Sequence, residues 1–106
     1  MLSGFEHVQK INRLIPPDYL RVQGHTLRIS AETFQQFGEP RKVEFFFNEA
    51  TKQILLRKAP KYSETAYAFR ERTMSIKSLR RRIKFPEGNY RCIIQDGALI
   101  ATYEGN

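Results

Sequence analysis

The pattern of apolar and polar residues along this chain is mostly that of short strands. Residues 19–22 and 26–29 alternate between apolar and polar side chains on either side of a Gln-Gly-His turn. Val43, Phe45 and Phe47 share one face of a further strand, and residues 54–57 form the returning strand after a longer polar turn. A period of two places alternate side chains on one face of a sheet, so each pair of runs predicts a hairpin with one buried face.

A short helix is expected between these hairpins, over residues 31–37. Ser30 precedes it and is a suitable N-cap, because its hydroxyl can accept a hydrogen bond from a free N–H group of the first turn. Phe34 and Phe37 are three residues apart and share one helical face. Gly38 fits the left-handed conformation beyond a helix end.

The same order of elements is predicted a second time. Residues 65–69 form the first strand, and Met74 and Ile76 mark the second. Residues 90–94 and 99–103 flank Asp-Gly, the dipeptide that favours the type I′ turn of a two-residue hairpin. A unit this short buries little core alone, so duplicated units are expected to pack on each other.

The helix of the second copy is expected to begin at Ser75 or Lys77. Leu79 and Ile83 should then face inward, together with the stem of Arg82. A helix of about two turns is not stable alone in water. Both short helices are therefore expected to depend on packing against the sheet.

An amphipathic helix is predicted over residues 3–15. Phe5, Val8, Ile11 and Ile15 recur at helical spacing before a Pro-Pro pair. Its apolar stripe should cover one face of the sheet or, alternatively, dock on another subunit. The chain is thus expected to be one domain with four segments. These are residues 1–18 (helix and Pro-Pro turn), 19–58 (first unit), 59–64 (linker) and 65–106 (second unit).

The positive charge is concentrated in one stretch. The 106 residues include 18 basic and 11 acidic side chains, a net charge of +7. Seven basic residues fall within residues 70–84, where one acidic residue occurs: Arg70, Arg72, Lys77, Arg80, Arg81, Arg82 and Lys84. Guanidinium and ammonium groups bind phosphate, so this stretch favours a polyanionic partner, nucleic acid before a membrane surface. A solvated helix face is the alternative interpretation.

Residues with the spacing of a catalytic or metal site are not found in the sequence. His7 and His25 fall in different predicted elements, and no pair of His or Cys has metal-ligand spacing. The single cysteine, Cys92, lies on an apolar strand, where a core role is expected, and it fits a reducing, cytoplasmic compartment. The longest apolar runs are too short to span a membrane. We therefore expect a protein that is not an enzyme and needs no cofactor or metal.

The element order resembles the swapped-hairpin family of bacterial DNA-binding proteins, which includes AbrB, SpoVT, MazE and the tandem-repeat MraZ proteins. Residues 29–38, Ile-Ser-Ala-Glu-Thr-Phe-Gln-Gln-Phe-Gly, are similar to the strand end and helix start of that family. Residues 78–83, Ser-Leu-Arg-Arg-Arg-Ile, are similar to its helix with the arginine pair. The resemblance covers residues 19–58 and 65–103.

This resemblance implies an α+β, mainly β fold. Two tandem β-β-α-β-β units would interlock their hairpins into one barrel-like body, beside the short N-terminal helix. Whether the units pair within one chain or exchange hairpins in a homodimer or higher oligomer stays open. The expected function is that of a small nucleic-acid-binding protein, a DNA-binding transcriptional regulator, with RNA as another option. A non-enzymatic protein–protein interaction or assembly role on the same fold is the alternative.

The family's DNA contacts come from arginines of the strand–helix segment and adjoining loops. Carried over to this chain, Arg80 and Arg81 match directly and Arg72 matches by position. Local charge alone adds Arg70, Lys77, Arg82 and Lys84. The first copy has Gln35-Gln36 on its helix, so the two copies are expected to differ in charge on the outer helix face.

Overall fold

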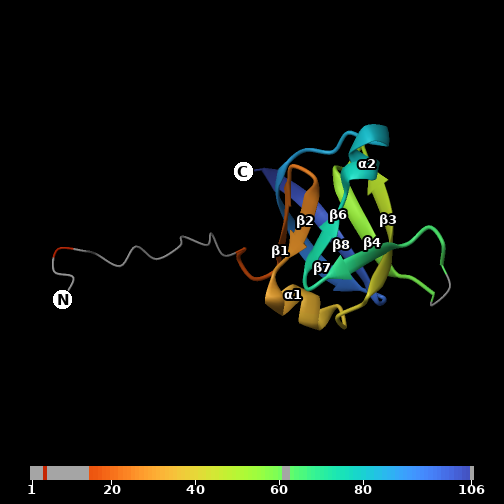
Figure 1. Cartoon of the computed structure of the whole chain (residues 1–106), viewed down its shortest axis with the longest axis horizontal. Coiled ribbons are helices and arrows are strands. Elements are labelled where there is room, and N and C mark those ends of the chain that lie inside the picture. Colours follow the sequence, from red (N-terminus) through yellow and green to blue (C-terminus); the bar gives the residue numbers. More distant parts are fainter. Residues whose placement is uncertain (1–3, 5–14, 61–62, 106) are drawn as a thin grey trace.

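The computed structural model describes Gly4, residues 15–60 and residues 63–105. In this part of the chain, eight antiparallel strands form one closed barrel, and two short helices are attached to it (Figure 1). The strands are β1 (Tyr19–Gln23), β2 (Thr26–Ile29), β3 (Lys42–Asn48), β4 (Gln53–Lys58), β5 (Tyr67–Arg70), β6 (Thr73–Ser75), β7 (Gly88–Gln95) and β8 (Ala98–Gly105). The helices are α1 (Ala31–Gln36) and α2 (Lys77–Arg82). The expectation of a mainly β, barrel-like body is confirmed.

The hairpins of the two halves of the chain alternate around the barrel. The order of neighbouring strands is β1-β2-β6-β5-β3-β4-β8-β7, and β7 pairs with β1 to close it. The hairpins β1–β2 and β3–β4 come from the first half of the chain. Each of them pairs on both sides with a hairpin of the second half. The closed sheet therefore needs both halves.

Alternate side chains of the strands fill the interior, as the period of two predicts. Val43, for example, is fully buried, and Phe45 and Phe47 on the same face pack against the core. The buried apolar residues among those described are Leu20, Val22, Leu27, Ile29, Phe34, Phe37, Val43, Ile54, Leu56, Met74, Ile76, Leu79, Phe85, Tyr90, Cys92, Leu99 and Ala101. Both halves and both helices contribute to this single core.

Several local predictions are confirmed by backbone geometry. Asp96 and Gly97 join β7 to β8 with φ of 52° and 77°, and a type I′ turn requires positive φ at both residues. Ser30 caps α1, since its hydroxyl oxygen accepts a hydrogen bond from the Thr33 N–H at 3.3 Å. Gly38 follows the helix with φ of 93°. Turn and cap residues thus determine where these elements end.

The two helices lie at opposite ends of the barrel (Figure 1). The strand that leads into each helix is hydrogen-bonded to a turn of the other half. Ile29 N–H donates to the Arg72 carbonyl at 3.0 Å, beside α1, and Ile76 N–H donates to the His25 carbonyl at 2.8 Å, beside α2. Each end of the barrel is therefore built from one helix and one turn of the opposite half.

The predicted N-terminal helix lies almost wholly outside the described residues. Of residues 3–15, the structure describes Gly4 and Ile15, and Gly4 has φ of 92°, which is not helical. Neither of the two described helices is long and apolar enough to cross a membrane.

Candidate nucleic-acid interface at the end of the barrel with α2

Helix α2 is held by packing, because its own sequence gives it little support. It has six residues, and its N-cap residue, Ile76, makes no side-chain capping hydrogen bond. Leu79 is buried and Ile83, just after the helix, packs against the core. Arginines in the last turn are favourable beside the carbonyl end of a helix. The helix thus docks through Leu79, whereas Lys77, Ser78, Arg81 and Arg82 are exposed.

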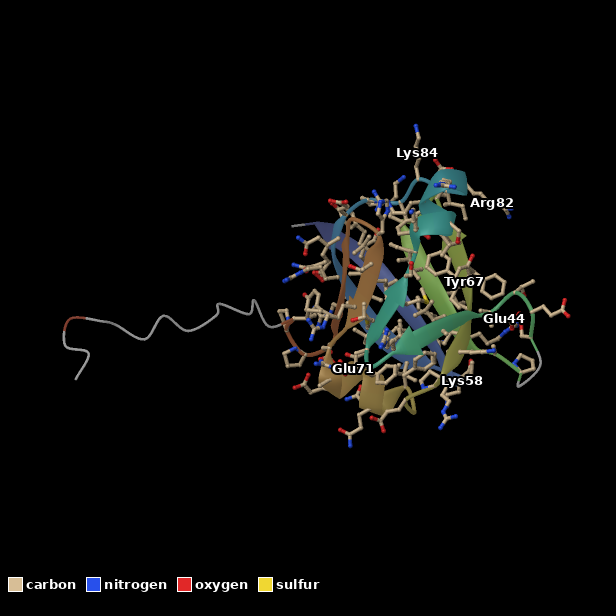
Figure 2. The ribbon with its side chains drawn as sticks, in the orientation of Figure 1. Glu44, Lys58, Tyr67, Glu71, Arg82 and Lys84 are labelled. Carbon is tan, nitrogen blue, oxygen red and sulfur yellow. The ribbon has the colours of Figure 1, made fainter. Side chains whose placement is uncertain are left out.

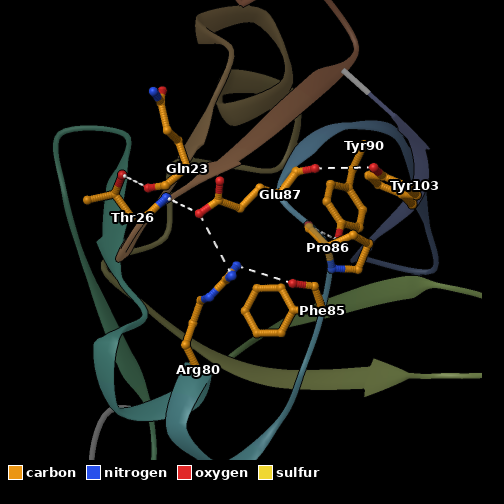
Figure 3. A network of polar contacts seen from close by, with 9 residues as sticks. Gln23, Thr26, Arg80, Phe85, Pro86, Glu87, Tyr90 and Tyr103 are labelled. Atoms are coloured by element: carbon orange, nitrogen blue, oxygen red, sulfur yellow. Dashed lines mark hydrogen bonds and ion pairs between the residues drawn. The ribbon is translucent and has the colours of Figure 1, made fainter.

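Arg80 is the one basic residue of α2 that turns back toward the barrel (Figure 3). Its guanidinium lies over the ring of Phe85 at 5.2 Å and donates to the Phe85 carbonyl at 3.2 Å. It also forms an ion pair with Glu87 at 3.8 Å, and its side chain is 26% exposed. These contacts stabilise α2 against the segment that follows it, and they use part of the donor capacity of Arg80 within the protein.

The segment after α2 is itself tied to the barrel wall (Figure 3). The Glu87 carboxylate accepts a hydrogen bond from the Gly24 N–H at 2.9 Å, in the turn between β1 and β2. The Tyr90 hydroxyl donates to the Pro86 carbonyl at 2.6 Å, and the Tyr103 hydroxyl donates to the Glu87 carbonyl at 3.2 Å. This network fixes the place of α2 relative to the barrel.

Four basic side chains at this end remain exposed to solvent: Lys77, Arg81, Arg82 and Lys84. No ion pair with a described acidic residue involves any of them. Arg82 and Lys84 point away from the barrel, beside α2 (Figure 2). Lys77 and Arg81 line a shallow hollow of about 320 Å³ together with two serines, Ser75 and Ser78. We call these four residues the α2 basic cluster.

The structure separates Arg70 and Arg72 from the α2 basic cluster. Arg70 ends β5 and Arg72 lies in the turn between β5 and β6, beside α1 at the opposite end of the barrel. Glu71, between them in sequence, lies near α1 in Figure 2, far from Arg82 and Lys84. Arg72 lines a hollow there with Glu39 and Glu71. The seven basic residues of the predicted site are thus divided between two ends of the molecule.

The orientation of two arginines differs from the sequence prediction. The stem of Arg82 was expected inward, but Arg82 is exposed and Arg80 is the inward residue. Aligning the helices by their first residues places Arg80 level with Phe34, which is buried in α1. That alignment is the signal in the sequence that could have identified the inward arginine. Phe85 and Glu87 were also missed, because neither carries a motif.

Two further reactive groups of the described chain, the Cys92 thiol and the Tyr90 hydroxyl, belong to buried residues. Burial raises the pKa of the Cys92 thiol to about 12, so the thiol is protonated at neutral pH. The Tyr90 hydroxyl also has a raised pKa because burial disfavours its charged form. In the described part of the chain, no three His, Cys, Asp or Glu side chains are grouped closely enough to hold a metal ion.

Comparisons of the chain with family models, with curated proteins and with solved structures return no match.

Proposed function

We propose that the protein binds nucleic acid, DNA in the first place, through the α2 basic cluster. The observation that carries this proposal is the group of four exposed cations at one end of the barrel, which make no ion pair with any described acidic residue. Exposed cations in a cluster repel one another, so the arrangement is favourable when an anion neutralises it. Phosphates along a backbone supply such anions at regular spacing.

The interleaved hairpins support a relationship in fold to the swapped-hairpin DNA-binding proteins. In the order β1-β2-β6-β5-β3-β4-β8-β7, the hairpins of one half alternate with those of the other, as interlocked units would. We accordingly propose that each half of the chain corresponds to one such unit and that the protein acts as a transcriptional regulator in the cytoplasm.

The chemistry of the cluster suits phosphate contacts more than base recognition. Arginine offers a planar set of donors that remains charged at all physiological pH values, and lysine offers a mobile point charge. Such contacts position a protein on a duplex, and contacts to base edges determine sequence preference. Arg80 has a positioning role in this proposal, because its contacts to Phe85 and Glu87 hold the helix that carries Arg81 and Arg82.

Fluorescence anisotropy with a short labelled DNA duplex, titrated across a range of salt concentrations, tests the proposal. Four phosphate contacts predict that log Kobs falls with log[salt] with a slope of about −3.6, since each contact contributes about −0.9. Replacing two contacts in Arg81→Gln plus Arg82→Gln should bring the slope to about −1.8. Affinity at low salt should fall by at least about tenfold, because one charge-assisted hydrogen bond contributes about 1.5 kcal/mol.

A matched control is Arg41→Gln plus Lys42→Gln, which removes two adjacent exposed charges where the chain enters β3 after α1. This variant should retain the wild-type slope. Equal losses in both double variants would show that binding depends only on net charge, and the site assignment would be wrong. Stronger competition by single-stranded RNA than by duplex DNA would replace DNA with RNA as the partner.

A further inference from the structure

The hollow beside α2 is lined by two cations and two hydroxyls. Lys77 and Arg81 supply an ammonium and a guanidinium, and Ser75 and Ser78 supply the hydroxyls. All four residues are exposed. None of the four side chains makes a hydrogen bond or an ion pair with another residue of the described chain. The donors of this hollow, which we call the α2 hollow, are therefore available to a ligand.

The spacing of these residues explains why their side chains share one place. Lys77 and Arg81 are four residues apart on α2, and Ser78 and Arg81 are three apart, so the three are neighbours on the helix surface. Ser75 is the last residue of β6, directly before the helix. Met74 is buried, so the alternation of the strand turns Ser75 outward. The α2 hollow thus forms where β6 leads into α2.

A corresponding hollow lies beside α1 at the other end of the barrel, with a volume of about 500 Å³. Both hollows are lined by the first and fifth residues of their helix. These are Ala31 and Gln35 in α1, and Lys77 and Arg81 in α2. Two carboxylates and one guanidinium also line the α1 hollow. A hollow at this place therefore comes from the fold, whereas the combination of cations with hydroxyls is a property of the α2 hollow.

The lining of the α2 hollow suits a phosphate monoester better than a phosphate diester. A monoester carries a charge of about −1.5 to −2 at pH 7 and has three free oxygens. A diester inside a nucleic-acid backbone has one negative charge and one fewer free oxygen. Two cations balance a dianion, and the guanidinium, the ammonium and the hydroxyls together supply donors for all of its free oxygens.

We propose that the α2 hollow binds the terminal phosphate monoester of a nucleic-acid strand. This inference rests on the proposed nucleic-acid binding and adds which part of the strand is recognised. Lys77 and Arg81 neutralise the terminal phosphate, and the two serines donate hydrogen bonds to its oxygens. Arg82 and Lys84 lie outside the hollow and point away from the barrel, where they contact phosphates further along the strand (Figure 2).

Fluorescence anisotropy with three DNA duplexes that differ only in their end groups tests the proposal. The duplexes share one sequence and one internal label, and they carry 5′-phosphates, 3′-phosphates or hydroxyls at their ends. At least one phosphorylated duplex should bind at least about tenfold more tightly than the hydroxyl duplex, because a terminal phosphate adds charge-assisted hydrogen bonds. We call this ratio of affinities the end preference.

Two double variants remove equal charge inside and outside the hollow. Lys77→Ala plus Arg81→Gln gives the α2 hollow the corresponding residues of α1 and should abolish the end preference. Arg82→Gln plus Lys84→Gln leaves the hollow intact, so it should weaken binding of all three duplexes and keep the end preference. Ser78→Ala changes no charge and suits a helix, and it should reduce the end preference by at least about threefold. Circular dichroism of each variant establishes that the barrel is folded.

A nucleoside 5′-monophosphate tests the hollow separately from polymer binding. Added to the full-length protein, it should shift the amide NMR signals of residues 75–81 more than the unphosphorylated nucleoside does. Equal affinity for all three duplexes, or an end preference that survives Lys77→Ala plus Arg81→Gln, would overturn the hollow and leave nucleic-acid binding standing. If none of the duplexes binds, nucleic-acid binding is wrong as well. Shifts from the monophosphate would in that case replace the strand end with a free nucleotide.

Discussion

The two ends of the barrel have the same arrangement of elements but different side chains. Each consists of a six-residue helix beside a turn of the other half. At the fourth residue, α1 has Phe34, which is 8% exposed and packs edge-on against Phe69 at 5.2 Å. At the same residue, α2 has Arg80, which lies over Phe85. One architecture thus accepts either a buried ring or a partly exposed guanidinium at this place.

The outer helix faces differ in charge as well. The fifth and sixth residues are Gln35 and Gln36 in α1 and Arg81 and Arg82 in α2. α1 is stabilised by its Ser30 cap and a buried ring, whereas α2 lacks a side-chain cap and relies on the contacts of Arg80. The comparison indicates that the end with α2 has less local stability than the end with α1 and more exposed positive charge.

The largest expected effect concerns the fourth helical residue. Phe34→Ala should reduce the free energy of unfolding by about 3 kcal/mol, because it removes a buried ring and leaves a cavity. Arg80→Ala should cost about 1 kcal/mol, since its ion pair and hydrogen bond are partly exposed to solvent. Urea unfolding of both variants measures the difference. Equal costs would mean that Arg80 is as much a core residue as Phe34, and the contrast between the ends would disappear.

A second prediction concerns how groups in the two halves make the free energy of unfolding depend on pH. Burial is the main cause of the raised pKa values of Cys92 and Tyr90, which both lie on β7 of the second half. The pKa of Tyr19, on β1 of the first half, is also raised, mainly by its hydrogen bond to Glu104. The stabilising contribution of Cys92 and Tyr90 is complete below the pKa of the unfolded thiol, near 9, and is lost as pH rises toward the folded values. The unfolding equilibrium constant should rise by up to about tenfold per pH unit above about pH 9 for Cys92 and above about pH 10 for Tyr90.

The pH dependence can be assigned with substitutions that remove one titration at a time. Cys92→Ala should flatten the fall in stability that begins near pH 9. Tyr90→Phe should flatten the part that begins near pH 10, the ordinary tyrosine value. An unchanged alkaline profile in both variants would show that neither group controls it. Urea midpoints measured from pH 7 to pH 11 provide the data.

The smallest expected effect concerns the turns that approach the helices. Gly24 begins the turn between β1 and β2 with φ of 58°, and Glu71 begins the turn between β5 and β6 with φ of 57°. A left-handed conformation is unfavourable for a residue with a side chain and easy for glycine. Glu71→Gly should therefore raise the free energy of unfolding by about 0.5 kcal/mol, whereas Gly24→Ala should lower it. Thermal melts of both variants test the expected opposite signs.

The sequence alone was sufficient for the local elements. Alternation in residues 43–47 placed Val43, Phe45 and Phe47 on the core side, as observed. Asp96-Gly97 and Ser30 marked a turn and a cap correctly, because these depend on the backbone preferences of a few adjacent residues. Such features are local, so no knowledge of the rest of the fold was needed.

The alternation of apolar and polar residues could not predict features that depend on pairing between strands distant in sequence. Phe46 and Ile93 are separated by 46 intervening positions and are brought to one level only by the register of four strands. Likewise, Arg72 and Lys77 are close in sequence, but β6 carries the chain from one end of the barrel toward the other between them. A run of positive charge in the sequence therefore became two separate groups in space.

The interleaved order of the hairpins also has a consequence for symmetry. Two identical half-chains assembled in this order would place the same helix at both ends, so their charge would be the same at both. A single covalent chain allows its halves to diverge while the pairing between them is kept. The peptide connection after β4 is therefore what permits one molecule to carry a cationic cluster at one end and a mixture of acidic and basic residues at the other.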